Sequence, residues 1–196
     1  QGAQAQNIVR AVTGAVDNPG KISLSDLKNY RVIERQPVCA PYREYEVCGM
    51  GAPSSGAIAL GEILGILQNQ DMKALGAENI HSWRWIGDAS RIAFADRDHY
   101  IGDPAFVNVP TRALISQAYL KPRAEEIRQA DKALENIQAG KFGKKYAQGM
   151  AVELPSTSHL VVVDKDGNVV SMTTSIENAF GSGLMANGYL LNNELT

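Results

Sequence analysis

The feature that most constrains the fold is a short turn between two apolar runs near the end of the chain. Leu160 to Val163 leads into Asp164-Lys165-Asp166-Gly167-Asn168, and Val169 to Ile176 continues with many β-branched residues. An Asp-Gly pair between two such runs is a strong signal for a β-hairpin. The sequence therefore predicts strands over 159–164 and 169–176, joined by a tight turn.

Hydroxyl side chains gather where this hairpin opens. Ser156-Thr157-Ser158 stands at the start of the first strand, and Ser175 stands at the end of the second. With Asp166-Gly167 as a two-residue turn, counting back along both strands pairs Ser158 with Ser175. Thr157 is then one step from the Ser175 hydroxyl.

A threonine in this position can serve as a nucleophile only if a base lies close to it. Its hydroxyl is weak at neutral pH and needs such a base before it can attack a carbonyl. Cleavage of the chain before Thr157 would free an α-amino group with a pKa near ~8 on the same residue. The ordinary alternative is that these Ser and Thr residues only begin a strand or form a turn.

Charge and hydropathy argue against several classes of function. The 196 residues include 19 basic and 21 acidic side chains, so no basic field favours nucleic acid. No apolar run approaches the roughly 18 residues that a membrane span requires. We expect a globular protein with no nucleic-acid partner and no membrane span in this chain. Both ends look like cuts through a longer protein, since the chain starts without Met or a leader.

Two cysteines flank a second predicted hairpin tip. Cys39 and Cys48 bracket residues 40–44, and they form either a disulfide in an oxidising compartment or a pair of buried thiols. Both alternatives stay open at this point. The histidines are scattered without the spacing of metal ligands: His81, His99 and His159. No metal site is predicted.

Helical spacing of apolar residues dominates the part of the chain before the hydroxyl cluster. Helices are predicted over 5–16, 57–68, 79–100, 111–119 and 122–137, with Ser23 capping a further short one. In 79–100 the candidates for the inward side are Trp83, Ile86, Ala93 and Phe94. Asp96-Arg97-Asp98 forms either a charged surface or a buried ion pair. Residues 138–155 are rich in Gly and Lys, which predicts a flexible surface segment.

Six short stretches are weak signals singly but specific in their order and spacing. They are Gly51–Gly56, Ala93–Asp98 with Ile101–Pro104, Thr157–His159, Asp164–Asn168, Phe180–Gly183 and Leu191–Glu194. Together they resemble the gamma-glutamyltranspeptidase family of N-terminal-nucleophile hydrolases, over nearly the whole chain. The resemblance implies a mixed α/β (α+β) class, as part of a four-layer αββα sandwich.

The resemblance also implies an inactive precursor, a zymogen that cleaves itself between Ser156 and Thr157. Residues 1–156 would be the C-terminal part of the large subunit, mostly helical with a mobile segment at about 138–156. Residues 157–196 would be the N-terminal part of the small subunit, with the β-hairpin as its core. The two subunits of one precursor would form a heterodimer.

The activity implied by the family is hydrolysis or transfer of the γ-glutamyl group of glutathione and related amides. Thr157 would be the nucleophile, its α-amino group the base, and Ser175 a supporting hydroxyl. Glu177 and Glu194 would bind the donor's α-amino group, although each could also be an ordinary exposed glutamate at a strand end. Neither cofactor nor metal is implied, and the location would be periplasmic or secreted.

This chain departs from the family pattern in ways that keep alternatives open. Ser158 stands where Thr is commoner, which is a mild difference. The family's carboxylate-binding arginine would precede residue 1, and its oxyanion-hole glycines would follow Thr196, so this chain alone is expected to be inactive. The alternatives are a cephalosporin or glutaryl acylase of the same superfamily and an uncleaved, inactive homologue.

Overall fold

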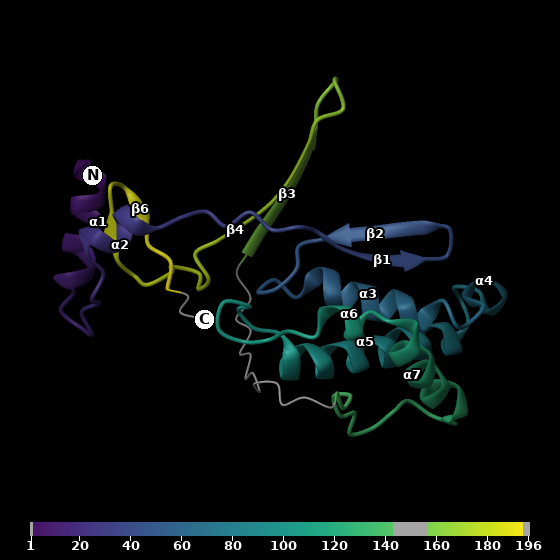
Figure 1. Cartoon of the computed structure of the whole chain (residues 1–196). Coiled ribbons are helices and arrows are strands. Elements are labelled where there is room, and N and C mark those ends of the chain that lie inside the picture. The colour runs from purple at the N-terminus through teal and green to yellow at the C-terminus, as the bar shows by residue number, and fades with distance from the viewer. Residues whose placement is uncertain (1, 143–156, 194–196) are drawn as a thin grey trace. The chain divides into compact units, whose positions relative to one another are not determined.

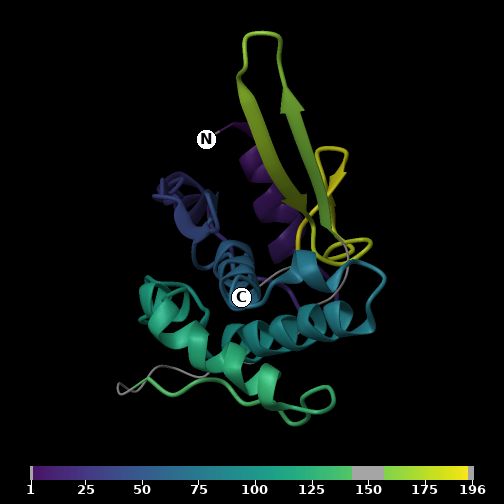
Figure 2. The ribbon, with the colours of Figure 1, turned by 90° about the vertical axis from the view of Figure 1, so that its right-hand side faces the viewer.

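The computed structural model describes residues 2–142 and 157–193, which fall into two compact units (Figures 1 and 2). Unit 1 comprises Gln1–Ile33 with Val152–Thr196, and unit 2 comprises Glu34–Ala151. The described strands form three separate two-stranded antiparallel ladders among helices. This mixture confirms the α+β class expected from the sequence.

Unit 1 combines two short helices with two hairpins. Its elements are α1 (Ala3–Thr13), α2 (Leu24–Asn29), β3 (Thr157–Val163), β4 (Val169–Ser175), β5 (Met185–Ala186) and β6 (Tyr189–Leu190). Helix α1 contacts β5, and the Asn7 side-chain amide donates to Oδ1 of Asn187, in the turn after that strand, over 2.8 Å. The predicted cap of α2 is confirmed, since Ser23 and Asp26 form a reciprocal capping box.

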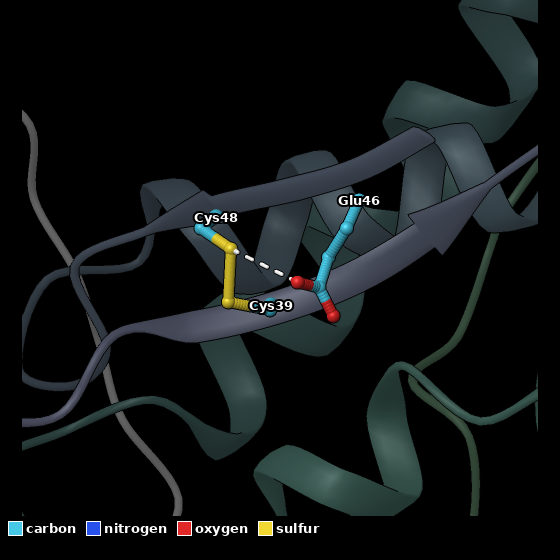
Figure 3. Close-up of side chains that lie close together, drawn as sticks. All are labelled: Cys39, Glu46 and Cys48. Atoms are coloured by element: carbon cyan, nitrogen blue, oxygen red, sulfur yellow. Dashed lines mark hydrogen bonds between the residues drawn. A yellow bond between two sulfur atoms is a disulfide. The ribbon is translucent and has the colours of Figure 1, made fainter. Parts of the chain in front are cut away.

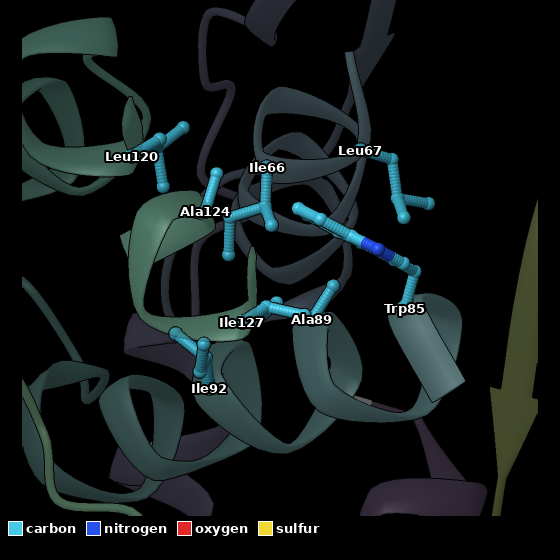
Figure 4. Close-up of a cluster of buried hydrophobic side chains, with 8 residues drawn as sticks. All are labelled: Ile66, Leu67, Trp85, Ala89, Ile92, Leu120, Ala124 and Ile127. Carbon is cyan, nitrogen blue, oxygen red and sulfur yellow. The ribbon is translucent and has the colours of Figure 1, made fainter. Parts of the chain in front are cut away.

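Unit 2 packs one hairpin and several helices around an apolar core. Its elements are β1 (Val38–Tyr42), β2 (Tyr45–Gly49), α3 (Gly56–Leu67), α4 (Met72–Leu75), α5 (Ile80–Tyr100), α6 (Thr111–Leu114) and α7 (Gln117–Gln129). Helix α3 contacts α5, α7 and β1. Helices α3, α5 and α7 together supply the main buried cluster, shown in Figure 4: Ile66, Leu67, Trp85, Ala89, Ile92, Leu120, Ala124 and Ile127.

The inward side of α5 differs in part from the prediction. Ala93 is buried as expected, but Trp83, Ile86 and Phe94 are among the exposed apolar residues. The buried side instead includes Trp85, Ala89, Ile92, Ala93 and Tyr100, at helical spacing. The buried side is thus rotated relative to the expected one, and both the large Trp85 and the small Ala89 belong to the buried cluster shared with α3 and α7. In the part of the chain that the structure describes, no helix has the length and apolarity of a membrane span.

The last predicted helix of unit 2 ends early. Helix α7 runs through Pro122 and stops at Gln129, so the expected helices 111–119 and 122–137 are placed wrongly. Side chains of α5 bind the backbone that follows α7: Arg84 donates to Ala130 O over 2.6 Å, and Asp88 Oδ1 accepts from Leu134 N over 3.1 Å. These contacts satisfy backbone groups that a longer helix would have paired internally.

The segment expected to be flexible is docked over its first residues. Phe142 packs against the rings of Tyr100 and Tyr119. The backbone N–H of Gly140 donates to Asp96 Oδ1 over 2.7 Å. Aromatic and carboxylate side chains of the helices therefore contact residues within 138–142. Residues 143–156 lie outside the described part of the chain.

Candidate functional site

The β3–β4 hairpin brings the candidate nucleophile directly opposite a second hydroxyl. Thr157 pairs with Ser175 in the antiparallel register, and Thr157 Oγ1 lies 3.0 Å from Ser175 Oγ. Thr157 is exposed and Ser175 is half-buried. A hydroxyl in this arrangement is accessible to a small molecule and is held by a hydrogen bond.

The register differs by one residue from the predicted one. Val163 is the last β3 residue paired with β4, opposite Val169. Asp164 N donates to Asn168 O over 3.0 Å and Gly167 N to Asp164 O over 3.2 Å, while Gly167 has a φ of 84°. The loop therefore has three residues with a left-handed glycine, which is a type I turn with a bulge rather than a two-residue turn.

This shift changes which face carries the hydroxyls. Side chains alternate between the faces of a strand, so the predicted register would have put Thr157 and Ser175 on opposite faces. In the observed register they share one face, and Ser158 pairs with Thr174 on the other. The observed register therefore strengthens the pairing on which the sequence argument depended.

The carboxylate of Asp164 holds the turn in this form. It accepts from the N–H groups of Asp166 and Asn168, each over 2.9 Å, and from the Asn168 side-chain amide over 2.8 Å. The side-chain amide and then these N–H groups lower the pKa of Asp164. The stabilisation that these hydrogen bonds give the folded state is therefore fully present when the pH is above the ordinary pKa of a carboxyl group. It is lost when acidification passes through the lowered pKa of Asp164.

A histidine extends the polar face along the same hairpin. His159 Nδ1 lies 2.8 Å from Thr173 Oγ1, and its Nε2 lies 3.0 Å from Ser171 Oγ. Sequence reasoning had set this residue aside because the histidines are not spaced as metal ligands. The signal that could have found it is the two-residue spacing between Thr157 and His159, which puts both on one face.

Glu177 follows β4 in an uncommon backbone conformation. Its φ is 69°, in the left-handed region that few residues other than glycine adopt. Its N–H donates to Ser175 Oγ over 2.9 Å. Ser175 therefore links two predicted site residues, because its oxygen contacts both the Thr157 hydroxyl and the Glu177 backbone.

Two asparagines that sequence reasoning assigned no role support this turn. The Asn193 side-chain amide donates to the Glu177 carboxylate, and Asn193 Oδ1 accepts from Asn178 N over 3.1 Å. The Asn192 side-chain amide donates to Ser175 O over 2.9 Å. Two consecutive asparagines after a strand were the available signal, but their hydrogen bonds to the end of β4 could not be predicted from it.

A glycine turn lets the supporting segment approach. Gly181 has a φ of 54°, and a Cβ built there would lie 2.1 Å from Leu191 O, so a side chain would collide with the backbone. Ser182 N donates to Leu191 O over 2.8 Å. This close approach brings residues 191–193 against the end of β4.

The other predicted site residues are not described. Ser156, on the expected cleaved bond, and Glu194, the second expected contact of the donor's α-amino group, lie outside the described residues. Of the predicted site, the structure brings together Thr157, Ser175 and Glu177.

The cysteines form a disulfide across the β1–β2 hairpin (Figure 3). Cys39 pairs directly with Cys48 in the register, which decides between the two alternatives left open above. Glu46 lies beside them, and the three side chains are close enough to share an ion. The two sulfur atoms are bonded to each other, so neither is a thiolate that could bind a metal.

A second cluster of titratable groups lies inside unit 2. Glu62 and Asp96 are fully buried, and Tyr119 donates to Asp96 Oδ2 over 2.6 Å. Burial, followed by the charge and hydrogen bond of Asp96, raises the pKa of Glu62 to about 10, against the opposing effect of Arg123. Burial and Asp96 also raise the pKa of Tyr119.

The chemistry of this cluster is that of a packed interior rather than an active site. The sequence predicted a charged surface or a buried ion pair at 96–98. Arg97 and the exposed Asp98 do form an ion pair, whereas the buried Asp96 accepts from the Tyr119 hydroxyl and the Gly140 N–H. Neither Glu62 nor Asp96 is accessible to solvent. As a neutral acid, Glu62 can donate its proton in a hydrogen bond to Asp96.

Comparison with known proteins identifies the family of this mixed α and β chain with its exposed hydroxyl pair. The family described as Gamma-glutamyltranspeptidase matches residues 1–196. The chain belongs to the gamma-glutamyltranspeptidase family.

Curated relatives agree with this assignment. The glutathione hydrolase proenzyme of Escherichia coli is 40% identical over 91% of this chain. An acylase ACY 1 proenzyme of a Pseudomonas strain is 38% identical over 89% of the chain. This chain spans only 30% and 31% of the lengths of these two relatives.

Solved structures share the fold. A gamma-glutamyltranspeptidase from Helicobacter pylori matches with a TM-score of 0.66 and 37% identity, over 71% of this chain and 40% of that chain. A cephalosporin acylase from Bacillus halodurans matches with a TM-score of 0.78 over 96% of this chain and 31% of its own, at 24% identity. The second match shows the fold alone.

Proposed function

We propose that the full-length protein hydrolyses or transfers γ-glutamyl groups of glutathione and related amides through an acyl-enzyme on Thr157. The observation that carries the proposal is the hydroxyl pair: Thr157 Oγ1 lies 3.0 Å from Ser175 Oγ at the open end of β3 and β4. Membership of the gamma-glutamyltranspeptidase family supports the choice of substrate.

The first step is cleavage of the Ser156–Thr157 bond by the chain itself. The Thr157 hydroxyl oxygen attacks the carbonyl carbon of Ser156, its proton passes to the departing nitrogen, and an ester replaces the amide. Water then hydrolyses that ester, which regenerates the hydroxyl and leaves a free α-amino group on Thr157. The name proenzyme, borne by the related glutathione hydrolases, supports such processing.

The second step uses the new amino group as the base. With a pKa near ~8 it is partly unprotonated at neutral pH, so it can take the Thr157 hydroxyl proton as the oxygen attacks the γ-amide carbonyl. The proton then passes to the leaving amine, and an ester joins the γ-glutamyl group to Thr157. Water or an acceptor amine releases the acyl group and restores the hydroxyl.

Acidic residues would select the donor. The exposed position of Thr157 leaves room for a substrate, and the half-buried Glu177 is joined to the same hydroxyl network through Ser175. We assign Glu177, together with Glu194, to binding of the donor's α-ammonium group, because a carboxylate is the natural partner of a cation.

The expected subunits and location form part of the same proposal. Cleavage would assign residues 1–156 to the large subunit and 157–196 to the small subunit of a heterodimer. The Cys39–Cys48 disulfide supports a periplasmic or secreted location, because such bonds persist in oxidising compartments. Residues 1–196 by themselves are expected to be inactive.

An acylase is the second candidate. The observation in its favour is the acylase ACY 1 proenzyme relative at 38% identity. A glutaryl amide lacks the α-amino group of a γ-glutamyl amide, so it gives Glu177 no cation to bind. The relative rates on the two amides therefore decide between the candidates.

The test follows processing and activity in the full-length protein. Intact-mass analysis is expected to show two chains, with Thr157 as the first residue of the smaller one, and a γ-glutamyl anilide is expected to be cleaved faster than a glutaryl anilide. Thr157→Ala is expected to abolish both processing and activity. Ser158→Ala is the matched control, because this neighbouring hydroxyl faces the other side of the hairpin.

Three outcomes would reject the proposal in different ways. A full-length chain as intact as its Thr157→Ala variant would identify an uncleaved homologue. Faster cleavage of the glutaryl anilide would identify an acylase. Equal loss of processing in Ser158→Ala and Thr157→Ala would remove the special role of Thr157.

A further inference from the structure

The turn after β4 is joined to a distant segment by one side chain with two contacts. Asn193 is half-buried, and its amide group donates to the Glu177 carboxylate while its Oδ1 accepts from Asn178 N over 3.1 Å. A carboxylate can only accept and a backbone N–H can only donate, so these partners determine the orientation of the amide. Asn193 therefore holds a side chain and the backbone beside it at once.

Hydrogen bonds also hold the backbone of the segment that carries Asn193. Asn193 N donates to Ile176 O over 3.4 Å, and Leu191 N donates to Leu184 O over 2.9 Å. The neighbouring Asn192 amide donates to Ser175 O. These bonds secure residues 191–193 to the end of β4, so the Asn193 side chain meets Glu177 from a supported position.

Glu177 needs such support because its own backbone does not provide it. Its φ of 69° lies in the left-handed region and not in the β region. The packing within a β-strand therefore does not restrain the Glu177 side chain. A glutamate has three rotatable side-chain bonds, and holding them in one conformation costs conformational entropy. A hydrogen-bond partner offsets this cost by stabilising one conformation. Among the described residues, Asn193 supplies the hydrogen bond recorded to the Glu177 carboxylate.

We infer that Asn193 is a positioning residue that holds the Glu177 carboxylate where it meets the donor's α-ammonium group, and so sets the preference for γ-glutamyl over glutaryl amides. This inference rests on the proposed function for the role of Glu177. It predicts a substrate-specific effect, because a donor without the α-amino group gains nothing from a correctly placed carboxylate.

The kinetic test uses variants of Asn193 and Glu177 in the full-length enzyme. Asn193→Asp keeps the acceptor for Asn178 N but replaces the donor facing Glu177 by a second carboxylate, and it is expected to raise KM for a γ-glutamyl anilide about tenfold. It should leave kcat/KM for a glutaryl anilide within about twofold. The double variant Glu177→Gln with Asn193→Asp restores one donor and one carboxylate, and its KM should lie below that of either single variant.

Asn192→Asp is the matched control for the added charge. It makes the same chemical change one residue away, where the lost contact is to the backbone of Ser175. We expect it to affect both anilides to the same extent. Equal effects of Asn193→Asp on the two anilides, or strictly additive effects in the double variant, would overturn the inference.

A spectroscopic test separates failure of this inference from failure of the proposed function. In full-length protein labelled with ¹⁵N-asparagine, Glu177→Gln is expected to shift the Asn193 side-chain amide signal and leave that of Asn192 in place. If the wild-type enzyme cleaves neither anilide, the proposed function fails while this signal still reports the contact. An unchanged Asn193 signal would overturn the inference whatever the activity.

Discussion

Two glutamates of this chain put the same carboxyl group to opposite uses. Glu62 of unit 2 is fully buried, and burial raises its pKa to about 10, so it is a neutral acid at pH 7. Glu177 of unit 1 is half-buried, and its carboxyl group accepts a hydrogen bond from the Asn193 side-chain amide. The first side chain belongs to the interior of its unit, and the second is the one that we propose binds a cation.

A perturbed pKa by itself therefore says little about function. Perturbed groups often mark active sites, and by that criterion Glu62 and Tyr119 would be the leading candidates. They belong to the interior that secures Gly140. The exposed hydroxyl pair at Thr157 is the better candidate because a substrate can reach it.

The largest expected effect on stability comes from removing the centre of the buried cluster. Asp96→Ala would leave the Tyr119 hydroxyl and the Gly140 N–H buried without their acceptor. We expect the free energy of unfolding of the full-length protein to fall by about 3–5 kcal/mol in urea titrations. The control is Asp98→Ala, an exposed neighbour, which should cost less than about 0.5 kcal/mol. Equal losses would show that Asp96 is not a buried anchor.

The next effect is a dependence of stability on pH that Glu62 causes. Its pKa rises from an ordinary 4.5 to about 10 on folding, so between these values the unfolded chain holds fewer protons than the native one. Stability from this group is complete below pH 4.5 and is lost as pH rises toward 10, by roughly 3 kcal/mol at pH 7.

Glu62→Gln removes that dependence without removing the volume. The amide cannot ionise, and it can still donate to Asp96 as the acid does. Melting temperatures of full-length protein between pH 5 and pH 9 should therefore decline less in the variant than in the wild type. Curves that stay parallel across this range would contradict the assignment of a neutral Glu62.

The smallest effect on stability is expected at the exposed site, where activity should suffer most. Ser175→Ala removes the partner of Thr157 Oγ1 and of the Glu177 N–H. The free energy of unfolding should change by less than about 1 kcal/mol, while cleavage of a γ-glutamyl anilide should fall at least about tenfold. Ser175→Thr keeps a hydroxyl and should restore most of the rate. If Ser175→Ala lowered the free energy of unfolding as much as Asp96→Ala, the expected difference between the two regions would be contradicted.

Local signals predicted much of this structure. The Asp-Gly turn between β-branched runs predicted the β3–β4 hairpin, and Ser23 was predicted to cap a short helix, as it does in α2. These features depend on residues within a few positions of one another. The same hairpin predicted that Thr157 and Ser175 lie close together, with a register that differs by one residue from the observed one.

One local contact and several long-range contacts account for what the sequence could not predict. Within the hairpin loop, the Asp164 carboxylate accepts hydrogen bonds that favour a three-residue loop, so the register differs by one residue from the predicted one. Arg84 and Asp88 bind backbone beyond Gln129, which ended α7 before its helical pattern did. The contact between Asn193 and Glu177 depends on a turn at Gly181 that brings residues 16 apart together. No periodic pattern in the sequence predicts this contact.

The three-residue loop of the hairpin has a consequence for engineering. Because side chains alternate along a strand, adding or deleting one residue between Val163 and Val169 would rotate one strand by half a period relative to the other. Thr157 would then face away from Ser175, although neither residue had been changed. The length of this loop therefore determines which face of the hairpin carries the Thr157 hydroxyl. An insertion in the loop, far from the hydroxyls, could remove their contact as completely as a substitution.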